Sequence, residues 1–80
     1  MTNTSTPLRS SKEVASAIAG NTRSILAGRG LNLEWLAAEI GIDVQTILKA
    51  FSERVETGLL FDLAFYLEVA PDRLIGADRA

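Results

Sequence analysis

Two side chains that can hydrogen-bond to the edges of bases, Gln45 and Lys49, stand four residues apart in the middle of the chain. If residues 44–52 form a helix, its turn of 100° per residue points both side chains away from the apolar side. A glutamine amide can bond the N6 and N7 edge of adenine, and a lysine can donate to O6 and N7 of guanine. Gln45 and Lys49 can therefore recognise base pairs. The alternative is that the two side chains form only the solvated face of an amphipathic helix.

Catalysis is a poor expectation, because the 80 residues include no Cys and no His. The commonest zinc ligands and the commonest general base are therefore missing, and no disulfide can form. Carboxylates, lysines and hydroxyls alone assemble no recognisable nucleophile and base. We expect no enzyme, no bound metal and no cofactor.

The elements that would position Gln45 and Lys49 begin after a polar stretch. Residues 1–10 are rich in Ser, Thr and Asn and predict a flexible N-terminal arm, followed by one domain at 11–76 and a short tail at 77–80. Ser10 and Glu13 have the spacing of a capping box, which predicts a helix from there to about residue 27.

Four further helices follow from apolar periodicity and from capping residues. Asn32 and Gly41 are the expected limits of a helix over 33–40, and Asp43 is the expected N-cap of a helix over 44–52. Residues 56–58 are expected to form a loop before a helix at about 59–68, and Pro71 opens a short helix over 71–75.

The order of residues from Gly30 to Leu74 resembles the phage-repressor and Cro-type helix-turn-helix family. The resemblance covers about sixty residues and rests on Gly30-Leu31-Asn32, Leu36-Ala37, Gly41-Ile42-Asp43, Thr46-Ile47, Leu60, Leu63-Ala64, Leu67, Val69 and Leu74. It implies an all-α, compact five-helix bundle of the lambda-repressor-like DNA-binding type, with the second helix of the motif in the major groove. It also implies that Val44 and Leu48 flank the base edges beside Gln45 and Lys49.

One departure from the family concerns Leu26 and Phe51. Relatives often carry an Arg and a Glu at these two positions, and here both residues are apolar. A hydrophobic contact can replace an ion pair without loss of stability. We therefore expect Phe51 to belong to the core.

The second departure from the family concerns charge. The chain carries a net charge of -2 and has a sequence pI of about 4.9. Glu34, Glu39, Asp43 and Glu53 lie in or beside the motif, where a duplex presents about one negative charge per 1.7 Å. Compensating phosphate contacts are expected from side chains near both ends of the motif: Asn32, Thr46, Ser52, Arg54, Arg23 and Arg29, with Arg9 and Lys12 as a possible DNA-binding arm.

Residues 59–67 are apolar almost all round, which exceeds what one buried face needs. Beyond the family's core positions there remain Leu59, Phe61, Phe65 and Tyr66. Large exposed apolar patches usually mark contacts, so this set is a possible dimer or partner surface. Burial under the arm or the last helix is the alternative.

The sequence favours a sequence-specific regulator of bacterial or phage origin, a repressor or Cro-like protein that binds a double-stranded operator as a homodimer. No stretch is long and apolar enough for a membrane span, so a cytoplasmic location is expected. One alternative hypothesis is a protein-binding adaptor or antirepressor, which the acidic composition favours. An antitoxin is another, although no toxin-binding tail follows Ile75.

Overall fold

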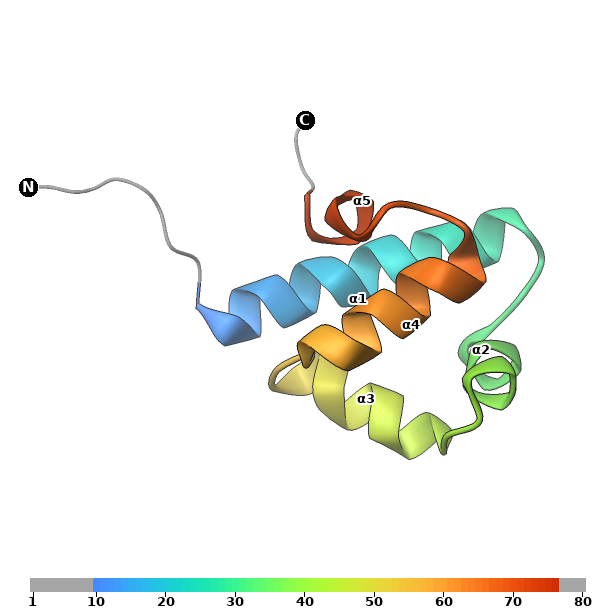
Figure 1. The fold of residues 1–80 in the computed structure, drawn as a ribbon, viewed down its shortest axis with the longest axis horizontal. Helices are drawn as coiled ribbons and strands as arrows, with labels where there is room; N and C mark the ends of the chain where they lie inside the picture. Colours follow the sequence, from blue (N-terminus) through green and yellow to red (C-terminus); the bar gives the residue numbers. More distant parts are fainter. Residues whose placement is uncertain (1–9, 77–80) are drawn as a thin grey trace, which may run out of the picture.

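Five helices joined by short connections make up residues 10–76, the part of the chain that the structure, a computed structural model, describes (Figure 1). The prediction of an all-α domain of five helices is confirmed for these residues. The expected tail, Arg9 and most of the expected arm lie outside them.

The first helix, α1, spans Ser11–Gly28 and begins as predicted. The Ser10 hydroxyl accepts a hydrogen bond from the Glu13 N–H, and the Glu13 carboxylate accepts one from the Ser10 N–H, both at 3.1 Å. This reciprocal pair satisfies two N–H groups that have no partner inside the helix. At the other end Gly30 takes a φ of 71°, a conformation that glycine adopts without strain, and turns the chain toward the second helix.

Helices α2 (Leu33–Ile40) and α3 (Val44–Ser52) have the predicted limits and caps. The side chain of Asn32 accepts the Trp35 N–H, and that of Asp43 accepts the Gln45 N–H, both at 2.9 Å. Gly41 ends α2 with a φ of 91°, which allows the turn. Only residues 41–43 separate the two helices.

Helix α4 spans Thr57–Leu67, so the prediction of a loop at 56–58 and of a helix start at 59 is wrong. The Leu60 N–H donates to the Glu56 carbonyl at 2.9 Å, which places Glu56 at the N-cap without a side-chain cap. Threonine and glycine are poor helix formers. Thr57 and Gly58 are tolerated here because they lie in the first turn, whose N–H groups make no hydrogen bonds within the helix. Glu68 ends α4 at a φ of 61°, and α5 spans Pro71–Ile75 as predicted.

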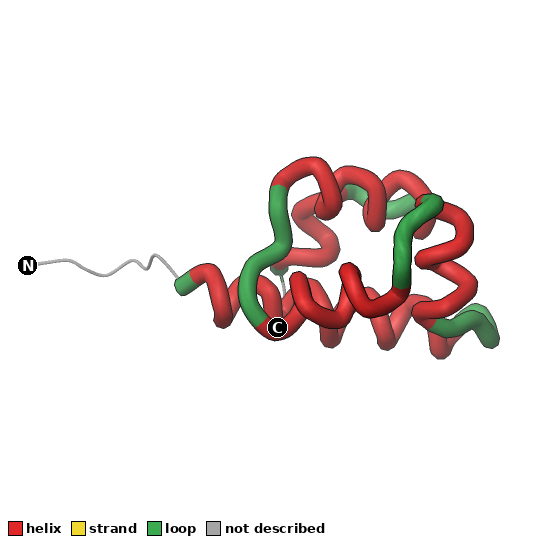
Figure 2. Tube along the Cα trace, turned by 90° about the horizontal axis from the view of Figure 1, so that it is seen from below, coloured by secondary structure: helices red, strands yellow, loops and turns green. Residues whose placement is uncertain are grey.

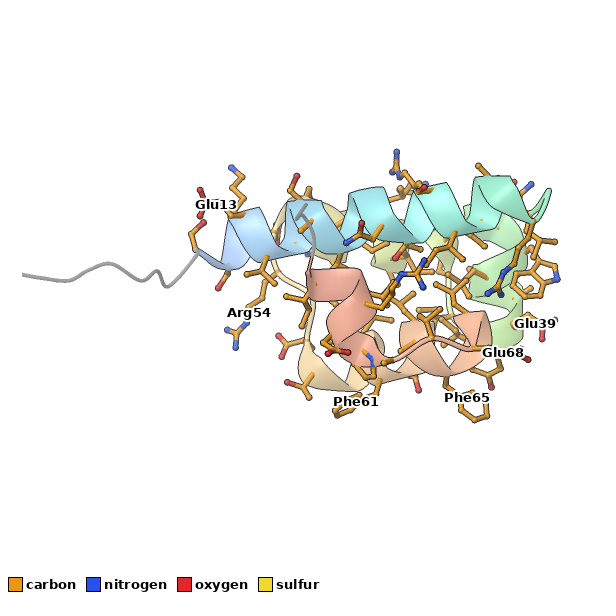
Figure 3. All side chains as sticks on the ribbon, turned by 90° about the horizontal axis from the view of Figure 1, so that it is seen from above. Glu13, Glu39, Arg54, Phe61, Phe65 and Glu68 are labelled. Carbon is orange, nitrogen blue, oxygen red and sulfur yellow. The ribbon has the colours of Figure 1, made fainter. Side chains whose placement is uncertain are left out.

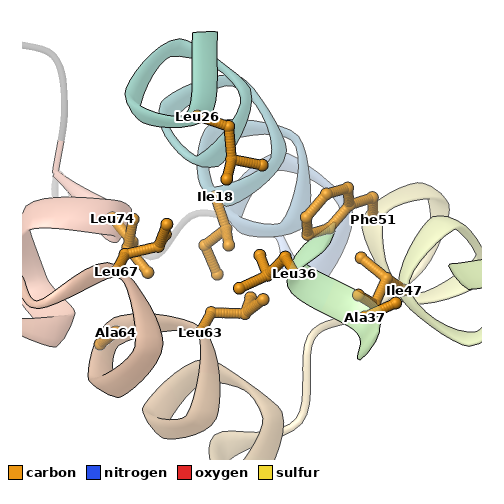
Figure 4. Close-up of a cluster of buried hydrophobic side chains, with 10 residues drawn as sticks. All are labelled: Ile18, Leu26, Leu36, Ala37, Ile47, Phe51, Leu63, Ala64, Leu67 and Leu74. Atoms are coloured by element: carbon orange, nitrogen blue, oxygen red, sulfur yellow. The ribbon is translucent and has the colours of Figure 1, made fainter. Parts of the chain in front are cut away.

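The core lies where α1 packs against α3, α4 and α5, and where α2 packs against α3 and α4. Figure 2 shows α1 as the long helix along one side, with the shorter helices beside it. The buried apolar side chains form one cluster: Ile18, Leu26, Leu36, Ala37, Ile47, Phe51, Leu63, Ala64, Leu67 and Leu74 (Figure 4). The expectation that Phe51 is a core residue is confirmed, with 7% of its surface exposed.

Thr22, on the buried side of α1, is fully buried, and its hydroxyl has no hydrogen-bond partner. A buried hydroxyl without a partner costs about 1–3 kcal/mol. We therefore expect Thr22→Val, which keeps the shape, to raise the free energy of unfolding by about 1 kcal/mol. Thermal unfolding followed by circular dichroism measures this, with Thr57→Val, at an exposed position, as the control. A lower melting temperature for Thr22→Val would show that the hydroxyl has a partner after all.

Candidate nucleic-acid interface

A hollow of about 440 Å³ lies where the end of α1 meets the beginnings of α2 and α3, and we call it the α1–α3 groove. Its wall combines apolar and polar side chains from these three helices and from the α1–α2 connection: Arg23, Leu26, Ala27, Leu31, Asn32, Leu33, Glu34, Val44, Gln45 and Leu48. It opens beside the first turn of α3.

The groove brings together five of the residues that the sequence predicted to contact DNA. These come from α1, the α1–α2 connection and α3: Arg23, Asn32, Val44, Gln45 and Leu48. Gln45 is exposed, whereas Val44 and Leu48 are half-buried, and Val44 packs against the core. Both aliphatic side chains line the groove.

The other polar side chains predicted on α3 lie outside the groove. Thr46, Lys49 and Ser52 are all exposed, as an outward-facing surface requires. The Ser52 hydroxyl donates to the Lys49 carbonyl at 2.9 Å within the last turn of the helix. Its proton is then engaged, although its oxygen can still accept a hydrogen bond.

Two helix N-termini open into the groove, because residues of the first turns of both α2 and α3 line it. The backbone N–H groups of Leu33 and Glu34 have no hydrogen-bond partner among residues 10–76. The backbone carbonyl and the side-chain amide of Asn32, the N-cap residue of α2, lie beside them. The positive ends of the helix dipoles favour an anion here. Glu34 and the capping carboxylate of Asp43 act against this, since both are exposed close to the same helix ends.

Arg23 is the cation of the groove. Its guanidinium carbon lies 5.9 Å from the centre of the Phe51 ring, which is within the range of a cation–π contact. The contact holds a long side chain against a buried ring, so less conformational freedom is lost when the guanidinium binds an anion. Leu26 lines the groove, and Phe51 lies beneath the guanidinium of Arg23.

The remaining predicted cations are not brought to the groove. Arg29 is exposed where α1 ends, whereas Lys12 is exposed in the first turn of α1, roughly 17 Å from Arg23 along the helix. Arg54 follows α3 and lies at the end of the molecule where α1 begins (Figure 3). The predicted phosphate contacts therefore extend along the molecule.

The predicted partner surface on α4 divides into two pairs. Phe61 and Phe65 are 55% and 72% exposed, while Leu59 and Tyr66 are half-buried and pack against the core. The rings of Phe65 and Tyr66 meet edge to face with centres 5.0 Å apart. Only the two phenylalanines present large apolar surface.

Sequence reasoning missed the apolar wall that Ala27, Leu31 and Leu33 give the groove. The available signal was Gly30, because a glycine in the left-handed conformation reverses the chain and lays Leu31 back on α1, where its N–H donates to the Leu26 carbonyl at 2.8 Å. A glycine between two predicted helices indicates a turn but not which side chains then meet.

Comparison of the chain with protein-family models, with curated proteins and with solved structures finds no match. Within residues 10–76, none of the helices has the length and apolar character to cross a membrane.

Proposed function

We propose that this domain is a sequence-specific double-stranded DNA-binding regulator of the phage-repressor and Cro type, with α3 as its recognition helix. The observation that carries the proposal is the α2–turn–α3 unit: a three-residue connection joins two capped helices whose first turns open into one groove with Gln45. A lambda-repressor-like helix-turn-helix combines these features.

The exposed face of α3 supports base reading. Gln45 and Lys49 are both exposed and one turn apart, so they can reach neighbouring base pairs from one helix. The half-buried Val44 and Leu48 beside them offer apolar surface to a thymine methyl group. The position of the reading residues near the N-terminus of α3 is the usual one for such helices.

Phosphate binding would depend on few charges. Arg23 on the Phe51 ring, the amide of Asn32 and the first N–H groups of α2 can hold one DNA strand beside the groove. The Asp43 carboxylate already accepts the Gln45 N–H and belongs to the helix cap. With so few cations, one copy binds weakly, and two copies on a palindromic operator in the cytoplasm are the proposed functional form.

A second candidate function is a protein-binding adaptor or antirepressor. The groove favours it, since six of its ten lining residues are apolar: Leu26, Ala27, Leu31, Leu33, Val44 and Leu48. In this case a partner's apolar side chain would enter the groove in place of a DNA strand, and the net charge of -2 would not matter.

Fluorescence anisotropy with labelled duplexes tests the proposal, using DNA that flanks the gene and duplexes selected from a random pool. We expect Gln45→Ala and Lys49→Ala each to weaken binding to the preferred duplex by 1–3 kcal/mol, about 5- to 150-fold, and to relax the preference at one base pair. Arg73→Ala on α5 removes an exposed cation away from the groove and is the matched control. No binding to any duplex at micromolar protein would refute the proposal and favour the adaptor.

A further inference from the structure

Two opposite charges line the α1–α3 groove, and the proposed phosphate contact uses only one of them. Arg23 and Glu34 both belong to the wall of the groove, and both are exposed. In the part of the chain that the structure describes, neither side chain forms an ion pair with the other or with a third residue. A phosphate on Arg23 would leave Glu34 as a repulsive charge beside it. A ligand that carries both charges would use both side chains.

The rest of the groove suits a small ligand with an apolar part. Its volume of about 440 Å³ lies within the roughly 300–1,000 Å³ that small-molecule sites occupy. Such sites combine mostly apolar walls with a few polar groups, and here six apolar side chains accompany Arg23, Glu34, Asn32 and Gln45. The groove therefore has the size and composition to bind a charged head and an apolar side chain together.

Asn32 adds a hydrogen-bond donor for an anionic group. Its side-chain oxygen accepts the Trp35 N–H at 2.9 Å, so its NH₂ group remains able to donate. The guanidinium of Arg23 is held against the Phe51 ring and can donate two hydrogen bonds to one carboxylate. The carboxylate of Glu34, in turn, can accept hydrogen bonds from an ammonium group.

We propose that the α1–α3 groove binds a free α-amino acid with a large apolar side chain. The carboxylate of the ligand pairs with Arg23 and the Asn32 amide, and its ammonium group pairs with Glu34. Its side chain lies on the apolar wall, and the burial of that side chain contributes most of the affinity. A fatty acid or a phosphate would leave Glu34 without a partner, and an amine would leave Arg23 without one.

A bound amino acid would also regulate DNA binding, and this part of the inference rests on the proposed function. Gln45, the proposed base reader, lines the same groove, and Arg23 is the cation proposed to hold a phosphate. The amino acid and the duplex would therefore compete for one surface. Binding of the amino acid itself does not depend on DNA.

Chemical shifts of the backbone amides of the full chain, titrated without DNA, measure the binding. Phenylalanine and leucine are the probes, and we expect dissociation constants on the order of 1 mM, because a ligand of about ten non-hydrogen atoms gains little in an open groove. The N-acetyl derivative lacks the ammonium charge and the amide derivative lacks the carboxylate. Each should bind roughly tenfold more weakly. Glycine, which has both charges but no side chain, should not bind measurably.

Two variants assign the charges. Glu34→Gln should abolish the preference for phenylalanine over N-acetylphenylalanine, and Arg23→Gln should abolish the preference for phenylalanine over its amide. The matched controls are Glu39→Gln on α2 and Arg73→Gln on α5, which remove exposed charges outside the groove and should keep both preferences. Circular dichroism of each variant checks that the domain is folded.

Two results would overturn the proposed site: no shift of the groove residues with phenylalanine at about 20 mM, or equal binding of phenylalanine and N-acetylphenylalanine. Both are measured without DNA, so they leave the proposed function untouched. Competition is tested by adding the same concentration of phenylalanine to the DNA anisotropy titration, with glycine as the control. At roughly twenty times its dissociation constant, phenylalanine should weaken DNA binding roughly twentyfold. An unchanged DNA affinity would overturn the regulatory part alone.

Discussion

Replacement of Leu36 by alanine is expected to lower the free energy of unfolding by about 2–5 kcal/mol and the melting temperature by roughly 10 °C or more. Leu36 has no exposed surface and lies at the centre of the core, between Ile18 of α1, Leu63 of α4 and Ile47 of α3 (Figure 4). Removing its side chain leaves a cavity that helices on three sides line, so the surroundings cannot collapse without moving a helix. Thermal unfolding followed by circular dichroism measures the loss.

The matched control for Leu36→Ala is Phe65→Ala, which removes a larger side chain from an exposed position. At 5 µM protein we expect this variant to change stability by no more than about 0.5 kcal/mol. Comparison of the two variants shows whether a side chain stabilises the fold because it is buried or only because it is hydrophobic. Similar losses in both variants would contradict the core described for residues 10–76.

Local capping signals explain why most helix limits could be predicted. Each of α1, α2 and α3 begins at a residue whose side chain accepts an N–H of the first turn: Ser10, Asn32 and Asp43. The interaction spans two or three residues, so the sequence contains both partners and no tertiary contact is needed. Gly41 is similarly informative, because a left-handed turn at the end of a helix favours a glycine.

Where no local signal exists, the prediction fails. The N-cap of α4 is Glu56, whose side chain makes no capping bond, so the start of α4 depends on packing against the core and not on its first residues. Thr22 is a second case, because threonine on an amphipathic helix is expected near solvent, yet here it is fully buried. Its place follows from how α1 lies against its neighbours, which a one-dimensional pattern does not contain.

One part of the candidate interface could likewise be predicted from the sequence, and another part depends on tertiary packing. That Gln45 and Lys49 point outward follows from helical periodicity alone, and both are exposed. The groove beside them depends on how the chain returns after Gly30 and on Arg23 lying over Phe51, two residues 28 positions apart in the sequence. Contacts at that separation are set by the packing of α1 against α3, and the composition of either helix does not reveal them.

The salt dependence of DNA binding is expected to be steep if the proposed function is correct. Three or four phosphates neutralised by each copy give six to eight contacts for a dimer, and the affinity should then fall a thousandfold or more between about 50 and 200 mM salt. Anisotropy titrations at several salt concentrations measure the slope of log affinity against log salt. A flat dependence would mean that the groove does not hold phosphates, and would favour a protein partner.

The charge of Arg23 should account for a defined part of that slope. Because its guanidinium lies over Phe51 at the edge of the groove, Arg23→Gln is expected to reduce the slope by about one for each copy and to weaken binding to all duplexes alike. Arg73→Gln, which removes the same charge from exposed α5, should leave the slope unchanged. A phosphate contact affects the slope only where the cation meets a phosphate. If both variants lower the slope equally, the effect is therefore explained by long-range attraction due to the net charge. If only Arg23→Gln lowers it, a phosphate lies in the α1–α3 groove, beside the residues proposed to read bases.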